Sequence, residues 1–112
     1  MAVTIYHNPK CSKSRETLKL IEEKGIAPQV VEYLKTPPSA AELKGILVKL
    51  GIPARDLLRK KEAAEAGVDP TLAEDALIAA MVANPAVIER PIVVTGDKAR
   101  LGRPPEQVLE IL

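Results

Sequence analysis

The chain has 112 residues, of which 46% are hydrophobic and 28% are charged, a size and composition typical of one folded globular domain. The 16 lysine and arginine residues nearly balance the 15 aspartate and glutamate residues, and aromatic residues make up 2%. Nucleic acids and anionic membranes favour basic surfaces, and single strands favour aromatic stacking platforms. We therefore expect neither a nucleic-acid nor a membrane partner, and an aliphatic core.

The sequence contains one cysteine, Cys11, and one histidine, His7. A single cysteine excludes an intramolecular disulfide, a CxxC redox pair and a multi-thiolate zinc site. The first ten residues lack the basic and apolar regions of a secretory signal, and the longest uncharged run, 76–88, is too short to span a bilayer. These features predict a cytoplasmic protein with no bound cofactor and no metal.

The first third of the chain predicts a strand, a helix and a second strand. Residues 2–6 alternate in hydrophobicity as a strand does, and 12–24 show helical spacing with Gly25 placed to end the helix. Residues 29–34 are rich in β-branched side chains, which favour a strand. Because this order is typical of a parallel crossover, we expect an α/β fold.

Helices are expected in the middle of the chain. Two capping boxes, 39–42 and 71–74, each stand before apolar residues at helical spacing. The first box precedes the periodic run 43–50, and Asn84 marks the end of the helix that follows the second box. Between these two helices the charged segment 53–65 is predicted as a further helix.

The last part of the chain predicts two strands and a helix. Residues 92–95 form a continuous apolar run, as expected for a strand covered on both faces. Turn residues at 96–98 separate this run from 99–102, which is expected to pair with it as a hairpin. A double proline at 104–105 begins a terminal helix. The inner side of that helix is predicted to carry Val108, Leu109 and Leu112.

The densest chemistry lies between the first strand and the first helix, in the segment His7-Asn8-Pro9-Lys10-Cys11-Ser12-Lys13-Ser14-Arg15. A thiol at a helix start faces unpaired backbone N–H groups and the positive end of the helix dipole, and both stabilise the nucleophilic thiolate. Lysines and an arginine add positive charge, and the serine hydroxyls can donate to sulfur or to a bound anion. Free cysteine is usually inert packing, but this polar loop favours a reactive Cys11.

Two further side chains of this segment have open interpretations. His7 orients the loop or shifts the ionisation of the thiol, or it ends the strand without a chemical role. Arg15 contributes charge to the site, or it ties the helix to the loop as a structural residue.

The pattern His7-Asn8-Pro9-x-Cys11-x-x-Ser14-Arg15 resembles the ArsC family, the glutaredoxin-linked arsenate reductases. The likeness continues over essentially the whole chain, in Tyr33-Leu34, Pro37-Pro38-Ser39, Glu42-Leu43, Leu57-Leu58-Arg59-Lys60, Arg90-Pro91-Ile92-Val93-Val94 and Arg100-Leu101-x-Arg103-Pro104. Several spaced motifs that agree are far more specific than one cysteine motif.

The resemblance implies a thioredoxin-like fold: β-α-β, a helical insertion, then β-β-α, around a mixed sheet. Residues 1–112 would form a single thioredoxin-like ArsC-type domain, with Pro91 at the cis-proline position. It also implies a catalytic group of Cys11, His7 and Ser14. The substrate-binding residues implied for the arsenate oxyanion are Arg59, Arg90 and Arg103. Guanidinium groups suit such an oxyanion because they form paired hydrogen bonds with it.

The implied activity is the reduction of arsenate to arsenite in arsenic detoxification. The Cys11 thiolate would attack arsenate and form a covalent adduct. Reduction needs a second thiol, and because the chain has no other cysteine, that thiol must come from outside. The resemblance implies glutathione as the thiol co-substrate and glutaredoxin as the protein partner.

Two alternatives remain open at this point. A thiol oxidoreductase of the same fold could act on glutathione mixed disulfides or on another substrate. A transcriptional regulator of the Spx type shares the fold, but such regulators typically carry CxxC where this chain has Cys11-Ser-Lys-Ser14, and they lack the full arginine set.

Overall fold

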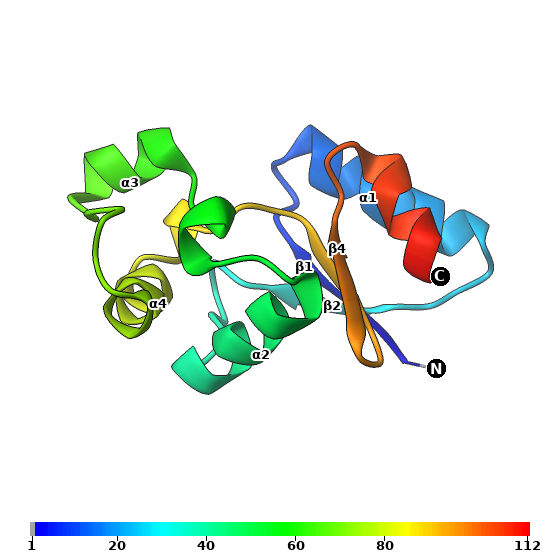
Figure 1. The fold of residues 1–112 in the computed structure, drawn as a ribbon. Helices are drawn as coiled ribbons and strands as arrows, with labels where there is room; N and C mark the ends of the chain where they lie inside the picture. Colours follow the sequence, from blue (N-terminus) through cyan, green and yellow to red (C-terminus); the bar gives the residue numbers. More distant parts are fainter. Residues whose placement is uncertain (1) are drawn as a thin grey trace. The chain divides into compact units, whose positions relative to one another are not determined.

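The computed structural model describes residues 2–112. Their contacts group into two compact units. The first unit comprises the chain up to Thr36 together with Arg90–Leu112, and the second comprises Pro37–Glu89. The first unit contains the sheet and the second is helical, in agreement with the predicted helical insertion (Figure 1). That both units together form a single domain stays a prediction.

The strands of the first unit form one four-stranded sheet within residues 2–112, in the order β2-β1-β3-β4. Strand β1 pairs parallel with β2 and antiparallel with β3, and β3 pairs antiparallel with β4. The strands are β1 (Val3–His7), β2 (Gln29–Glu32), β3 (Ile92–Thr95) and β4 (Lys98–Leu101). The α/β prediction with a mixed sheet and a terminal hairpin is confirmed.

Two helices of the first unit, α1 (Ser12–Glu23) and the 3₁₀-helix η3 (Pro105–Ile111), contact each other (Figure 1). Alternate residues of β1, one residue of β3 and one face of each helix form an aliphatic core, as the composition predicts. The buried members of this core are Val3, Ile5, Ile21, Val93, Val108 and Ile111. Because β1 lies between β2 and β3, its carboxyl end and the start of α1 are held on a packed framework.

The terminal helix differs from the prediction. It is a 3₁₀-helix with three residues per turn, so Pro105, Val108 and Ile111 share the buried side. Leu109, expected on the inner side, is 37% exposed and that expectation is wrong. Leu112 packs partly buried against the core, as expected.

Strand β2 is shorter than the predicted range of 29–34. It ends at Glu32, whose backbone carbonyl accepts hydrogen bonds from the amides of both Lys35 and Thr36 at 2.9 Å. These two bonds close a turn, so residues 33 and 34 leave the strand although Tyr33 remains buried. The turn carries the chain out of the first unit.

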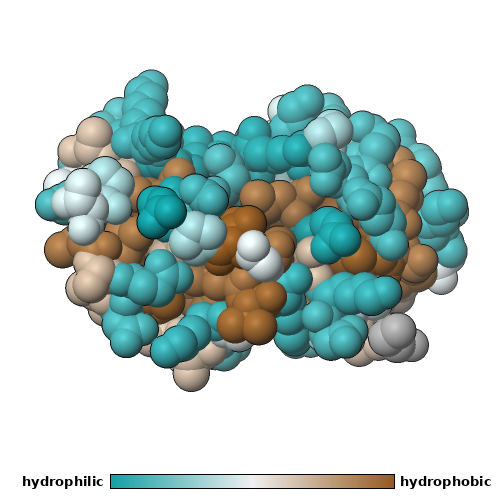
Figure 2. Space-filling model, in the orientation of Figure 1, coloured by the Kyte–Doolittle hydropathy of each residue, from teal (hydrophilic) through white to brown (hydrophobic). Residues whose placement is uncertain are grey.

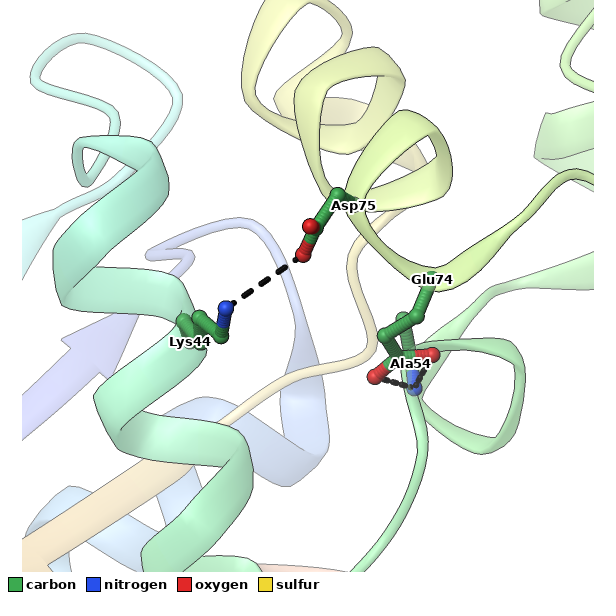
Figure 3. A network of polar contacts seen from close by, with 4 residues as sticks. All are labelled: Lys44, Ala54, Glu74 and Asp75. Carbon is green, nitrogen blue, oxygen red and sulfur yellow. Dashed lines mark hydrogen bonds and ion pairs between the residues drawn. The ribbon is translucent and has the colours of Figure 1, made fainter.

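The second unit consists of α2 (Ala40–Leu50), η1 (Ala54–Leu57), α3 (Lys60–Ala66), α4 (Glu74–Ala83) and η2 (Pro85–Val87). The predicted first capping box is confirmed, because Ser39 Oγ accepts from the Glu42 amide at 3.1 Å and Glu42 Oε1 accepts from the Ser39 amide at 3.2 Å. Helices α2 and α4 contact each other, and Lys44 and Asp75 form an ion pair between them at 3.4 Å (Figure 3).

The single helix predicted over 53–65 is wrong. The segment forms η1, then an extended stretch, then α3. Leu58 forms an isolated antiparallel bridge with Ile88, and the Arg59 amide donates to the Val87 carbonyl at 2.7 Å. Because these backbone groups pair with a distant segment, they cannot also form the hydrogen bonds of a continuous helix.

The second predicted capping box is also wrong. The Glu74 carboxylate accepts from the Ala54 amide, with oxygen–nitrogen distances of 3.0 and 3.2 Å (Figure 3). The Thr71 hydroxyl donates instead to Asp69 Oδ1 at 2.7 Å, so α4 begins only at Glu74. Both partners of the expected box are engaged elsewhere, and Glu74 links α4 to η1 rather than capping its own helix.

The face of the molecule in Figure 2 is largely hydrophilic, with apolar residues in patches between the charged ones. Among residues 2–112 no helix is both long enough and apolar enough to cross a bilayer. Large apolar side chains exposed by more than a third are Val30, Leu34, Val48, Leu72 and Leu109. Some exposed apolar residues are usual in folded domains.

Candidate active site

Cys11 lies between β1 and α1 and is the N-cap residue of α1. Its backbone is extended, with φ −93° and ψ 124°. The Cys11 amide donates to the Asn8 carbonyl at 3.0 Å, and the Cys11 carbonyl accepts from the Arg15 amide at 3.0 Å as the first bond of the helix. The thiol therefore stands at the end of α1 where backbone N–H groups have no helical acceptor. Its residue is 8% exposed, so the sulfur is shielded without being fully enclosed.

The surroundings of Cys11 favour its thiolate. Burial is the largest single effect and raises the pKa of the thiol. The backbone amides of Ser14 and Lys13, together with the guanidinium groups of Arg90 and Arg103, act in the opposite direction. Together these groups hold the pKa of Cys11 below its ordinary value of 9.0, as predicted for a nucleophile at a helix N-terminus.

The lowered pKa predicts the pH dependence of Cys11 alkylation. We expect the rate of reaction with iodoacetamide to rise with pH and to reach its midpoint below pH 9.0. Only the thiolate reacts, and in the folded chain the thiolate persists to lower pH. The chain has one cysteine, so the measured rate belongs to that thiol alone. The same chain unfolded in urea is the control. A midpoint in the folded chain equal to or above that of the unfolded chain would contradict the prediction.

His7 and Ser14 lie together beneath the loop. The distance between His7 Nδ1 and Ser14 Oγ is 2.6 Å, and Ser14 Oγ also accepts from the Asn8 amide at 3.0 Å. Both side chains are buried, and Ser14 is fully so on the inner face of α1. The pair joins the last residue of β1 to the first turn of α1, and it thereby fixes the two ends of the loop that carries Cys11.

The imidazole of His7 is held in its neutral form. Burial lowers its pKa below 6.5, the nearby Glu32 carboxylate raises it, and the Arg15 guanidinium lowers it further. Glu32 is the register partner of His7 across β1 and β2. The net direction is downward, so near neutral pH the ring carries one proton and can both donate and accept a hydrogen bond.

The His7 shift can be checked by proton NMR, since this is the chain's only histidine. We expect its Cε1 proton to titrate with a midpoint below 6.5. Because the folded state has the lower pKa, the unfolded chain takes up the proton first, and the native state loses stability as pH falls below 6.5. An imidazole that titrates at or above the midpoint of the urea-unfolded chain would contradict the prediction.

Two more residues hold the loop, Asn8, which had no separate predicted role, and Arg15, whose role the sequence leaves open. Asn8 Oδ1 accepts from the Lys10 amide at 3.0 Å, and Arg15 Nη1 donates to the Pro9 carbonyl at 2.9 Å. The Arg15 contact matches the interpretation of that residue as a tie between helix and loop. For Asn8 the signal was present, because asparagine commonly accepts from the amide two residues later in a turn.

Arg90 and Arg103 belong to the same unit as Cys11. Arg103 Nη2 lies 3.8 Å from Cys11 Sγ, and Arg103 Nε donates to the Arg90 carbonyl at 2.8 Å. Each arginine precedes a cis peptide bond, to Pro91 and Pro104 respectively. The cis bond at Pro91 agrees with what the family resemblance implies. The second cis bond has no counterpart in the sequence-based expectations.

Gly102 brings the segment before Arg103 close to α1. Its amide donates to the Pro91 carbonyl at 3.0 Å. A Cβ atom at this position would overlap Thr17 Oγ1 and would lie 2.7 Å from Pro91 Cγ. The missing side chain therefore permits the approach that sets Arg103 beside the thiol. No local pattern could have predicted this, because the crowding atoms come from two distant segments.

We expect Gly102→Ala to destabilise the chain by about 1–3 kcal/mol, because the added methyl group must displace packed side chains. The matched control is Gly45→Ala in α2, where a Cβ meets nothing within 4 Å. That change should stabilise by about 0.5–1 kcal/mol, since alanine favours a helix over glycine. Urea denaturation of both variants measures the difference. Equal stability of Gly102→Ala and the parent chain would contradict the proposed crowding.

Arg59 belongs to the second unit, where it is the N-cap residue of α3. Its Nη2 forms an ion pair with Glu62 Oε2 at 2.9 Å, and its Nη1 donates to the Ala86 carbonyl at 3.4 Å. The other five predicted site residues lie in the first unit, namely His7, Cys11, Ser14, Arg90 and Arg103. The Arg59 side chain instead contacts residues of the second unit. Among residues 2–112, histidine, cysteine and acidic side chains form no group of three that could hold a metal ion.

Residues 6–111 match the ArsC family model. The chain belongs to the ArsC family. A relative named arsenate reductase from Neisseria meningitidis serogroup A is 50% identical and covers 98% of this chain and 97% of its own length. The Escherichia coli K12 protein YfgD, whose name calls it uncharacterized, is 58% identical over 98% of this chain and 96% of its own length. The family predicted from the spaced motifs is confirmed.

The fold of this ArsC chain is likewise shared with solved structures. A structure titled arsenate reductase from Vibrio cholerae superposes with a TM-score of 0.93 at 58% identity, covering 100% of this chain and 98% of that one. The α/β, thioredoxin-like expectation with a mixed sheet is therefore confirmed.

Proposed function

We propose that this protein is an arsenate reductase in which the Cys11 thiolate is the nucleophile. The observation that carries the proposal is the Cys11 site itself, a thiol of lowered pKa at a helix N-terminus with the Arg103 guanidinium 3.8 Å from its sulfur. Full-length relatives named arsenate reductase, about half identical in sequence, support this substrate.

The first step joins two anions, the thiolate and arsenate, and it therefore needs positive charge. Arg103 lies beside the sulfur, and its Nε donates a hydrogen bond to the backbone carbonyl of Arg90. The guanidinium groups of both arginines are suited to hold an oxyanion by paired hydrogen bonds. A sulfur–arsenic bond forms and an arsenic–oxygen bond breaks, and the departing oxygen takes up protons from the substrate and solvent to leave as water. Fixed cations favour this step because they are already oriented toward the developing charge.

The second step requires two electrons, which two thiols supply together when they form a disulfide. The balance is one arsenate and two thiols giving one arsenite, one disulfide and one water. Since the chain has no second cysteine, at least one of these thiols belongs to another molecule. In line with the family resemblance we assign both to other molecules, glutathione first and glutaredoxin second. Their mixed disulfide is the oxidised product, and the electron pair of the broken bond between glutathione sulfur and arsenic reduces the arsenic. Water then cleaves the bond between Cys11 sulfur and arsenic, so that arsenite leaves and Cys11 returns to its thiolate.

The remaining site residues have supporting roles in this proposal. The His7–Ser14 contact and the Arg15–Pro9 contact hold the loop so that Cys11 keeps its N-cap position. Arg59 is proposed as a third substrate-binding arginine on the resemblance of its segment alone.

Arsenite production by the purified chain tests the proposal. We expect turnover with arsenate, glutathione and glutaredoxin together, and turnover at background level when any one of the three is omitted. A second assay supplies a glutathione mixed disulfide as the substrate. A chain that reduces this disulfide but forms no arsenite would replace the proposal with the alternative thiol oxidoreductase. Full turnover without glutaredoxin would overturn the assignment of the protein partner.

A further inference from the structure

The helical unit contains a cavity that the proposed chemistry does not use. It lies between η1, α3 and the segment after α3, and its volume is about 550 Å³. Its apolar lining consists of Leu58, Ala63, Ala64, Val68 and Pro70. Three of these residues are buried core positions, so the floor of the cavity is part of the packed unit. The volume falls within the range of small-molecule sites in proteins.

The polar lining of the cavity consists of three charged side chains and Thr71. Arg55 and Lys60 contribute two exposed cations and Asp56 contributes one exposed anion. The charge of the lining is therefore positive overall. Exposed charges of this kind add little binding free energy, but they select the sign of a ligand's charge.

We propose that this cavity binds a small anionic molecule with an apolar body, of the class of aryl carboxylates. The apolar floor would bury the ring system, and the carboxylate would lie at the rim near Arg55 and Lys60. The chain neighbours of Arg59 on both sides, Leu58 and Lys60, line the cavity, so a bound molecule contacts the chain on either side of that arginine. Binding itself requires neither Cys11 nor arsenate, and the inference therefore stands apart from the proposed function.

The test compares two probes with the same ring system, similar size and opposite charge. We expect 1-naphthoate to bind the full chain with a Kd of about 1 mM or lower, a strength usual for a ligand of this size, and 1-naphthylmethylammonium to bind at least about fivefold more weakly. Saturation-transfer NMR titrations measure both. Equal binding of the two probes, or no binding of naphthoate at several millimolar, overturns the proposal.

Two matched pairs of variants locate the binding. Ala64 in α3 lines the cavity and Ala79 in α4 does not, and both are exposed helical alanines. We expect Ala64→Trp to abolish naphthoate binding and Ala79→Trp to leave its Kd within about twofold, because only the first indole occupies the cavity. Equal losses in the two variants overturn the assignment of the cavity.

The second pair changes charge without filling space. Lys60 lines the cavity and Lys61 does not, and both are exposed. We expect Lys60→Glu to raise the naphthoate Kd at least about fivefold and Lys61→Glu by less than about twofold, since the interaction weakens with distance in water. This pair still decides the question if the tryptophan variant at Ala64 does not fold. Equal effects of the two lysine variants contradict a carboxylate at this rim.

Discussion

Replacement of the proposed nucleophile, Cys11→Ser, is expected to lower arsenate turnover by at least about 10³-fold while the chain remains folded. A serine hydroxyl at this N-cap stays protonated at neutral pH, so it cannot take the place of the thiolate whose pKa the surrounding amides and guanidinium groups lower. Serine is close to cysteine in size and is a favoured N-cap residue, so the helix start should be preserved. Arsenite formation with glutathione and glutaredoxin gives the rate, and urea denaturation gives the stability.

A second variant separates the presence of a thiol from its position. In Cys11→Ser/Ser12→Cys the thiol moves by one residue into the first turn of α1, to an exposed position. We expect no recovery of arsenate turnover, because Arg103 reaches the sulfur at position 11. Turnover within tenfold of the parent chain in either variant would refute the assignment of Cys11 as the nucleophile.

The second large effect is expected from Arg103→Ala. Arg103 contacts the Cys11 sulfur and holds the Arg90 carbonyl, so its removal takes away a cation and loosens a second one. We expect kcat/KM for arsenate to fall about 10²–10³-fold, the usual cost of losing one preorganised donor to a developing anion. The pKa of Cys11 should rise as well, since the Arg103 charge is one of the causes that lower it. Absorbance of the thiolate at 240 nm follows that change.

Two further variants control this experiment. Arg100→Ala removes an arginine of β4 that pairs with Glu110, and it should change kcat/KM by less than about threefold. Arg103→Lys keeps the positive charge but loses the planar guanidinium group and its paired hydrogen bonds. Compared with Arg103→Ala, we therefore expect the thiol pKa to return closer to the parent value than kcat/KM does. An Arg103→Ala chain with the parent's thiol pKa and the parent's kcat/KM would remove this arginine from the proposed site.

The features that the sequence predicted correctly depend on neighbouring residues. The capping box of Ser39 and Glu42 closes within one helical turn, and the spacing of aliphatic residues places β1, α1 and the hairpin of β3 and β4. The N-cap position of Cys11 follows from the same local logic, since a strand, a proline-containing loop and a helix start lie within ten residues. Hydrogen bonds of this range form between neighbouring residues wherever no other group competes for the same atoms.

The incorrect predictions share one cause, which is competition from a distant segment. Glu74 had a local partner available in Thr71, yet its carboxylate accepts from Ala54, twenty residues earlier. The charged run 53–65 has helical composition, but the amide of Arg59 donates to Val87 and the helix is interrupted there. Once the fold places a distant donor or acceptor beside a backbone or carboxylate group, that partner satisfies the group and the local pattern loses its effect.

The sequence alone determined the single cysteine, the near-neutral charge and the loop motif, and with them the family. The external thiol is a prediction that follows from the single cysteine. The tertiary structure decided the contact between Arg103 and the thiol. Arg103 is separated from Cys11 by 92 positions, and it reaches the sulfur because β4 pairs beside β3 and because Gly102 leaves room against Thr17 and Pro91. Such a contact depends on strand order and on the volume of distant side chains, which no local spacing encodes.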